Sequence, residues 1–445
     1  MKKNILLLFA FAFCINSYSQ KFDEFFKDST LRIDYIFSGN TKQQQISVDK
    51  LNCSPRWYGK RNRLSEIPVE GNGQITVRDH KSHKVIYKNS FSTLFQEWLS
   101  YDEAKTTSRS FQNVFIVPMP KDTADITVDL RNNRRKIMTT FTHQVVPTDI
   151  LIRKIGFKDR TKYINIQQPQ DTSNCIHIAY VAEGYKENEM NVFLDDVNKA
   201  VESLFFYEPF KSLKSKFSIV AVESPSIDSG TSEPGKGIWK KTALSSHFDT
   251  FYSERYLTTL NLEDLHDWLA GIPYEHIIVL VNSSRYGGGG ILNSYNLTTA
   301  HNPRTKPVVV HEFGHSFAGL GDEYGYDFEL IPTIASFKYL SYFDQINEFK
   351  NVRYFYKMYK LIDMLCVYKT LIQRYEELNS SNYNSSSSKT FQLAIFCDDK
   401  HLFESCQITA IKIYKEYFFT HKNTSINDNV LAHSLNHILN EFFEE

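Results

Sequence analysis

The chain has 445 residues, of which 51 are Lys or Arg and 51 are Asp or Glu, so its formal net charge is zero. This balance argues against a nucleic-acid-binding protein, which needs a strongly basic surface. At this length the chain is expected to hold two or three domains.

Residues 1–19 have the pattern of a secretory signal peptide. Lys2 and Lys3 carry the positive charge, residues 5–13 are apolar, and Ser17 and Ser19 are the small residues that precede a cleavage site. The apolar run is shorter than the roughly 20 residues that cross a bilayer, and no later apolar run suggests a membrane span. We therefore expect a secreted protein, or one held at the cell surface or in the periplasm, with no stable membrane span.

Residues 20–150 are predicted to form an all-β domain. Short segments of alternating apolar and polar residues recur there, and turn-forming glycines and prolines separate them. In one such segment Ile126, Val128 and Leu130 alternate with polar residues, as in a strand with one buried face. These segments predict a β-sandwich. No catalytic group of residues is visible in it, so we expect an accessory, substrate-positioning or merely shielding role.

The pattern changes to mixed α/β over residues 151–330. Three largely apolar runs, residues 176–182, 217–222 and 276–281, are typical of strands buried on both faces. Apolar residues three or four apart in residues 188–206 predict a helix between the first two strands.

Four consecutive glycines, residues 287–290, follow the third of these strands. Glycine has no side chain, so another backbone can approach it closely. Gly288, Gly289 and Gly290 are therefore candidate substrate-binding residues. A flexible loop is the alternative that the sequence leaves open.

The sequence His-Glu-x-x-His occurs at residues 311–315, with His311, Glu312 and His315 in the three defined positions. Residues four apart lie on one face of an α-helix, so both histidines can direct a ring nitrogen at one metal ion. Imidazole nitrogen is a preferred ligand of Zn²⁺, and a glutamate beside the first ligand can act as general base toward a water molecule. The pattern predicts a peptidase with Zn²⁺ as its cofactor.

A catalytic zinc site needs three protein ligands and one open position. Gly319 is expected to end the helix, because glycine readily adopts the left-handed conformation found at helix ends. A chain that reverses there can deliver a carboxylate to the metal. Asp322 is the predicted third ligand, and Glu323 and Glu329 are the alternatives.

The tail, residues 331–445, differs in composition from the rest of the chain. Every glycine lies at or before Gly325 and every proline at or before Pro332. More than 100 residues without these turn formers are predicted to be helical. The fold class expected for the whole chain is α+β, with an N-terminal β-sandwich, a mixed α/β catalytic domain and a C-terminal helical tail.

Several motifs together resemble the secreted zinc metallopeptidases of the IgA-peptidase family. The sequences that carry the resemblance are YVAEGY (180–185), SGTSEPGKGIWKKTALSSHFDTFYSERYLTT (229–259), YGGGGI (286–291) and HEFGHSFAGLGDEY (311–324). The resemblance covers roughly residues 21–326. It implies a metzincin-like catalytic domain, with His311, His315 and Asp322 as zinc ligands and Glu312 as the catalytic base.

The leading hypothesis is a secreted zinc-dependent endopeptidase that hydrolyses extracellular proteins, with IgA-like glycoproteins among the candidate substrates. Its expected partner is a protein or peptide substrate. The resemblance does not continue after Tyr326. Two alternatives therefore stay open: an exported binding protein without catalysis, and an inactive fusion product that lacks the lower catalytic subdomain.

Overall fold

The computed structural model describes residues 22–67, 69–132, 135–169, 175–207 and 210–320. This part of the chain contains three β-sheets and a smaller share of helix, which confirms the α+β class. Within it, no helix is long and apolar enough to span a membrane. The predicted signal peptide, residues 1–19, and the predicted helical tail, residues 331–445, lie outside the described residues.

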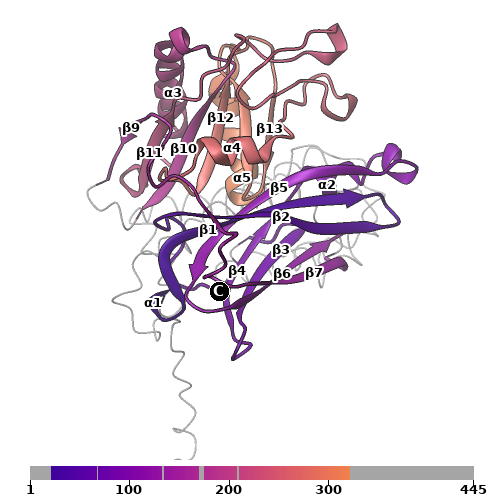
Figure 1. Cartoon of the computed structure of the whole chain (residues 1–445). Helices are drawn as coiled ribbons and strands as arrows, with labels where there is room; N and C mark the ends of the chain where they lie inside the picture. The colour runs from indigo at the N-terminus through magenta and orange to yellow at the C-terminus, as the bar shows by residue number, and fades with distance from the viewer. Residues whose placement is uncertain (1–21, 68, 133–134, 170–174, 208–209, 321–445) are drawn as a thin grey trace, which may run out of the picture.

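Two four-stranded sheets build the N-terminal part, with strand orders β5-β1-β2-β8 and β4-β3-β6-β7 (Figure 1). Their pairs are antiparallel except for the parallel pair of β2 and β8. The strands are β1 (Phe26–Gly39), β2 (Gln44–Pro55), β3 (Gly73–Asp79), β4 (Val85–Phe91), β5 (Arg109–Pro120), β6 (Ala124–Arg131), β7 (Ile137–Val145) and β8 (Arg153–Lys154).

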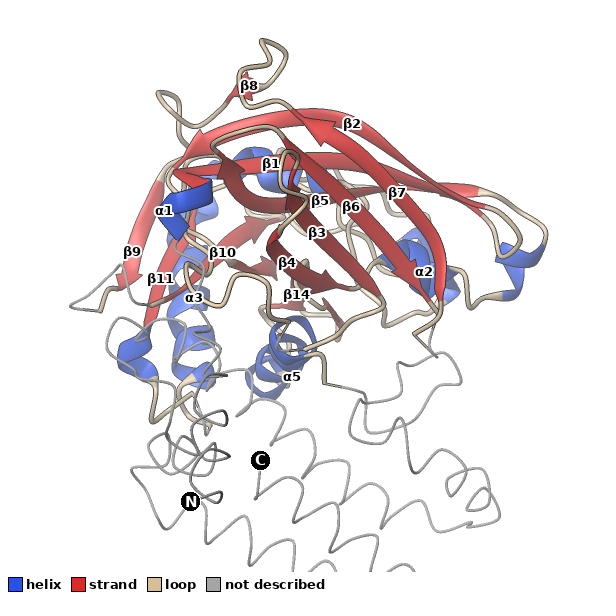
Figure 2. Ribbon diagram, turned by 90° about the horizontal axis from the view of Figure 1, so that it is seen from below, coloured by secondary structure: helices blue, strands red, loops and turns tan. Residues whose placement is uncertain are grey.

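The two sheets pack face to face as a β-sandwich (Figure 2). The rings of Phe91 on β4 and Phe115 on β5 lie 4.1 Å apart between centroids. The hydroxyl of Tyr35 on β1 lies 2.6 Å from His143 Nε2 on β7. Strand β6 buries every second side chain, which confirms the alternation seen in the sequence. We call this unit the N-terminal sandwich; its sheet continues to β8, slightly past residue 150.

A six-stranded sheet forms the second unit, which we call the α/β part. Its order is β13-β14-β12-β10-β11-β9, with four parallel central strands and an antiparallel strand at each edge. The strands are β9 (Tyr163–Gln167), β10 (Ile176–Glu183), β11 (Phe217–Val222), β12 (His276–Val281), β13 (Gly288–Ile291) and β14 (Tyr295–Thr299). All residues of β10 and β11 are buried, as the apolar runs predicted.

Helices α3 (Met190–Leu204) and α5 (Thr305–Ala318) share an apolar core with one face of this sheet. The opposite face shares its core with α4 (Leu262–Trp268) and the sandwich. Short helices α1 (Phe22–Phe25) and α2 (Leu94–Trp98) belong to the sandwich. The 3₁₀ helices of the described loops are η1 (Asp102–Lys105), η2 (Glu187–Glu189), η3 (Lys214–Lys216), η4 (Pro234–Lys236) and η5 (Thr250–Tyr252).

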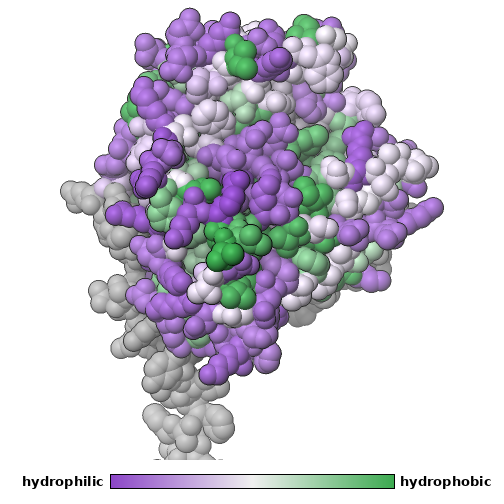
Figure 3. Space-filling model, viewed as in Figure 1, coloured by the Kyte–Doolittle hydropathy of each residue, from purple (hydrophilic) through white to green (hydrophobic). Residues whose placement is uncertain are grey.

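Charged side chains join the two units at helix α4. Arg32 on β1 is 3% exposed and pairs with Asp34 at 2.7 Å and with Asp267 of α4 at 2.5 Å. Lys50 on β2 forms an ion pair with Glu263, at the other end of α4. The face shown in Figure 3 is mostly hydrophilic, with hydrophobic residues gathered where the two units meet.

Candidate metal centre

Helix α5 carries the His-Glu-x-x-His sequence, and its two ends are well defined. At the start, the hydroxyl of Thr305 donates to the carbonyl oxygen of Thr299 at the end of β14, at 2.6 Å. At the end, Gly319 is left-handed with φ of 62°, and its amide donates to His315 O at 3.0 Å. The prediction that Gly319 ends the helix is confirmed. Residues 308–310, although β-branched, lie within the helix.

One face of α5 is buried and the other carries the motif. Phe313 and Phe317 are 0% and 2% exposed, and their rings stack 5.1 Å apart between centroids. His311 is exposed, whereas Glu312 and His315 are partly buried. The buried phenylalanines hold the helix against the sheet, so the three motif side chains lie on the open side of the helix.

The two histidines turn the same ring nitrogen toward each other. Their Nε2 atoms are 3.0 Å apart, and His315 Nδ1 lies 2.5 Å from the carbonyl oxygen of Leu320. A carbonyl only accepts, so the neutral tautomer that fits this contact has its proton on Nδ1 and a lone pair on Nε2. Two nitrogens bound tetrahedrally to one zinc ion at 2.0–2.1 Å are roughly 3.3 Å apart. The donor atoms therefore fit a shared divalent metal ion.

The predicted third ligand lies beyond the described chain. Among residues 22–320, apart from the gaps given above, no group of three His, Cys, Asp or Glu side chains is arranged to hold a metal. Asp322, Glu323 and Glu329 all fall outside the described residues. Their role as third ligand stays a prediction.

Strand β13 packs directly against α5, and two glycines make this approach possible. A Cβ atom placed on Gly288 would lie 2.4 Å from Glu312 Oε1. One placed on Gly290 would lie 2.3 Å from the carbonyl oxygen of Glu312 and 2.9 Å from His315 Cβ. Any side chain at these positions would overlap the helix or the Glu312 carboxylate. The predicted substrate-binding glycines thus form the strand beside the motif rather than a loop.

Gly289 faces the opposite side of the strand. A Cβ atom there would lie 2.8 Å from the ring of Tyr256 and 2.9 Å from Leu257 O. Residues 256 and 257 run along the outer edge of β13, where the Leu257 amide donates to Gly288 O at 3.4 Å. Gly288 and Gly290 therefore face α5, whereas Gly289 faces the segment of Tyr256 and Leu257.

A buried carboxylate links two of the motifs that carry the family resemblance. Glu183, at the end of β10, is 0% exposed. It accepts hydrogen bonds from Thr242 Oγ1 at 2.5 Å, Leu244 N at 2.8 Å and Ser246 N at 2.9 Å. Burial raises the pKa of Glu183, and these hydrogen bonds oppose the rise. The carboxylate holds the long segment before Tyr256 against the sheet.

A second network holds the segment that leads into α5. Asp196 on α3 is 4% exposed and accepts from the Tyr185 hydroxyl at 2.9 Å. His301 Nε2 lies 2.6 Å from the same carboxylate oxygen, Asp196 Oδ2. His301 sits between β14 and α5, so this network ties the start of α5 to α3.

Two residues beside the motif were not singled out from the sequence. Tyr256 packs on the outer edge of β13. Asn293 lies in the turn between β13 and β14, and its backbone N–H donates to Ser316 O at 2.8 Å. The sequence carried one signal for Asn293, because Asn is a common left-handed turn residue and its φ is 50°. Neither residue's partner could be read from the sequence, since the partners are distant along the chain.

A helix with two histidines one turn apart and a glutamate beside the first is the arrangement of a metallopeptidase. Comparison with protein families supports this class. The family described as Peptidase M64 N-terminus matches residues 21–142, and the family described as IgA Peptidase M64 matches residues 164–331. The chain therefore belongs to the M64 family of IgA peptidases, as the resemblance indicated. A search of curated proteins found no match.

Proposed function

We propose that this chain is a secreted zinc-dependent endopeptidase with a metzincin-like catalytic domain. The observation that carries the proposal is the pair of histidine Nε2 atoms, 3.0 Å apart on the open face of α5. Glu312, the residue after the first histidine, lies on the same helix against β13. Family membership supports peptide-bond hydrolysis as the reaction.

His311, His315 and Asp322 are the proposed zinc ligands. The hydrogen bond from His315 Nδ1 to Leu320 O shows that the chain returns toward this histidine just after Gly319. That return favours a ligand soon after residue 320, as Asp322 requires. When bound, zinc polarises a carbonyl group and lowers the pKa of a coordinated water to about 7.

Glu312 is the proposed general base. Its carboxylate takes one proton from the attacking water, whose oxygen forms the new bond to the scissile carbonyl carbon. As the carbon–nitrogen bond breaks, Glu312 returns this proton to the leaving amine. Gly288 fits this role, because its missing side chain leaves room for the carboxylate beside the strand.

Strand β13 is the proposed binding edge for an extended substrate, through Gly288, Gly289 and Gly290. It is an edge strand of the six-stranded sheet, and an extended peptide can add to such an edge through backbone hydrogen bonds. The carbonyl oxygen of Gly288 already accepts a hydrogen bond from the backbone N–H of Leu257. Backbone groups point alternately to the two sides of a strand, so Gly290 offers the next outward pair. The substrates are extracellular proteins, IgA-like glycoproteins among them.

Metal analysis of the purified full chain tests the proposal first. We expect about one zinc per chain, its loss in His311→Ala, and its retention in Glu312→Gln. His80→Ala is the matched control, since His80 is a half-exposed histidine of the sandwich. It should leave zinc content unchanged.

Cleavage of a peptide library, with and without chelator, tests the reaction. Glu312→Gln should lower kcat roughly 10²–10⁴-fold, the usual contribution of a general base. Wild type without zinc would overturn the proposal, and so would a Glu312→Gln variant that cleaves as fast as wild type. A zinc-free, stably folded wild type would favour the exported binding protein instead.

Amino-terminal sequencing of the exported protein tests secretion. Cleavage after Ser19 predicts a mature protein that begins at Gln20. Protein found only inside the producing cell, with its amino terminus uncleaved, would contradict this localisation.

A further inference from the structure

Asn293 connects the sandwich to helix α5 through two hydrogen bonds, one from its backbone and one from its side chain. Its backbone amide donates to Ser316 O on α5 at 2.8 Å. Its side-chain Nδ2 donates to Ser90 O on β4 of the sandwich, also at 2.8 Å. Ser316 directly follows His315, so the sandwich reaches the turn of α5 that carries the second histidine.

Packing around this link brings further sandwich residues to the end of α5. The amide of Ser92 donates to Leu292 O at 3.0 Å. A Cβ atom on Gly319 would lie 2.9 Å from Val69 Cγ1 and 3.4 Å from the side chain of Leu292. The residue that ends the helix therefore sits between a sandwich loop and the turn after β13.

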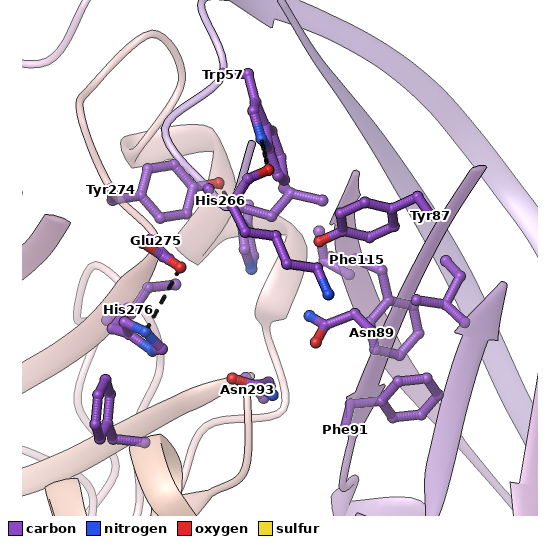
Figure 4. A pocket seen from close by; sticks show the side chains of 18 of the residues that line it. Trp57, Tyr87, Asn89, Phe91, Phe115, His266, Tyr274, Glu275, His276 and Asn293 are labelled. Carbon is purple, nitrogen blue, oxygen red and sulfur yellow. Dashed lines mark hydrogen bonds and ion pairs between the residues drawn. The ribbon is translucent and has the colours of Figure 1, made fainter. Parts of the chain in front are cut away.

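A cavity of about 90 Å³ lies next to the link, between the two units. Figure 4 shows Asn293 at its wall, on the side facing Asn89 and Phe91 of the sandwich. Because this stretch of the interface is not filled by side chains, apolar packing alone does not set the distance between the units here. The hydrogen bonds from Asn293 Nδ2 to Ser90 O and from the Ser92 amide to Leu292 O supply that restraint.

A second link supports strand β13. Glu97 on α2 of the sandwich accepts a hydrogen bond of 2.6 Å from the hydroxyl of Tyr256. Burial, and then the charge of Glu97, hold the pKa of Tyr256 well above its usual range, so the hydroxyl stays a donor. The Tyr256 ring packs on Gly289, and the preceding residue of the strand, Gly288, lies against the Glu312 carboxylate.

We propose that the N-terminal sandwich positions the catalytic groups, through Asn293 at the His315 end of α5 and through Glu97–Tyr256 at the strand beside Glu312. Three residues act here as positioning residues: Asn293, Tyr256 and Glu97. Asn293 supports the backbone next to His315, a proposed zinc ligand. Tyr256 and Glu97 support the strand beside Glu312, the proposed base. This inference rests on the proposed function. It assigns to the sandwich a role in catalysis beyond shielding.

Two variants separate positioning from simple stabilisation. Asn293→Gly keeps the left-handed conformation but removes the donor to Ser90 O. Tyr256→Phe keeps the ring but removes the donor to Glu97. Glu263→Gln is the matched control, because it weakens the Lys50–Glu263 ion pair between the same two units, at α4.

We expect Asn293→Gly to weaken zinc binding roughly tenfold, measured by competition with a chromogenic chelator, as loss of outer supporting contacts does. We expect Tyr256→Phe to lower kcat roughly tenfold with KM changed less than about twofold, because it disturbs the base rather than substrate contacts. Glu263→Gln should match wild type in both measurements. Melting temperatures of all three variants are recorded alongside.

Wild-type zinc affinity in Asn293→Gly together with wild-type kcat in Tyr256→Phe would overturn the inference. Losses in the control equal to those in the two variants would overturn it as well. If wild type itself neither binds zinc nor cleaves peptides, the proposed function fails. Hydrogen exchange at the amides of residues 316–318 then decides: faster exchange in Asn293→Gly than in wild type and control supports positioning, and equal exchange refutes it.

Discussion

Alanine at Gly288 and at Gly290 should damage the site in two different ways. Both positions face α5, but they meet different atoms of it. A Cβ on Gly288 meets Glu312 Oε1, the far end of a flexible side chain, at 2.4 Å. A Cβ on Gly290 meets the backbone carbonyl oxygen of Glu312 at 2.3 Å, and backbone cannot rotate out of the way.

The distances give the size of each effect. Ordinary van der Waals contact begins at 3.4 Å, so relief at either position needs a movement of about 1 Å. In Gly288→Ala the Glu312 carboxylate moves, and a misplacement of about 1 Å costs roughly 10²-fold in kcat with little loss of stability. In Gly290→Ala the helix and strand must separate, which costs about 1–3 kcal/mol of unfolding free energy, the usual range for overpacking.

Three measurements distinguish the variants: urea unfolding, zinc content and kcat. Gly288→Ala should keep its zinc and its stability but lose activity, whereas Gly290→Ala should lose stability, zinc and activity together. Gly237→Ala is the control, since its Cβ would meet nothing within 4 Å and only its left-handed φ of 68° is strained. It should cost about 1–2 kcal/mol and leave kcat unchanged. Full activity in Gly288→Ala would refute the placement of Glu312 beside the strand.

Three further predictions concern the supports of the site. Burial raises the pKa of Glu183 above 4.5, so its contribution to stability is complete below that pH and declines as pH rises through the folded-state pKa. Glu183→Gln should abolish this decline in urea unfolding measured from pH 4 to pH 7. Asp196→Asn should cost about 1–3 kcal/mol, since it disturbs the bonds from Tyr185 and His301, and a double-mutant cycle with Tyr185→Phe should show coupling. Phe313→Ala should cost about 3–5 kcal/mol in thermal unfolding, because the ring is fully buried beneath the motif.

Local patterns were sufficient to predict most of the elements that carry the site. The apolar runs at residues 176–182, 217–222 and 276–281 correspond to β10, β11 and β12, because a strand buried on both faces needs apolar residues at every position. The spacing of His311 and His315 placed both rings on one side of a helix, and Gly319 marked its end. These features depend on residues within a few positions of one another.

Contacts between distant segments could not be predicted in the same way. Gly288 and Gly289 are neighbours in the sequence, yet one meets Glu312 and the other meets Tyr256, because successive positions of a strand face opposite sides. Nothing in a run of four glycines says which helix or loop covers which side. The third ligand is a different case, since Asp322 and its alternatives fall outside the described residues.

The role proposed for the N-terminal sandwich rests on contacts that leave no mark in the sequence. Residues 20–150 carry no catalytic motif, and the sequence alone predicts an accessory, substrate-positioning or shielding role for them. The Asn293 side chain donates to the backbone carbonyl of Ser90. Every residue type has such a carbonyl, so this hydrogen bond cannot be predicted from a residue pattern. Tyr256 and Glu97 are 159 positions apart in sequence, and neither suggests the other until the fold brings them to 2.6 Å. The proposed zinc-binding histidines and the proposed base lie on one helix, and atoms from both units contact that helix or the segments beside it.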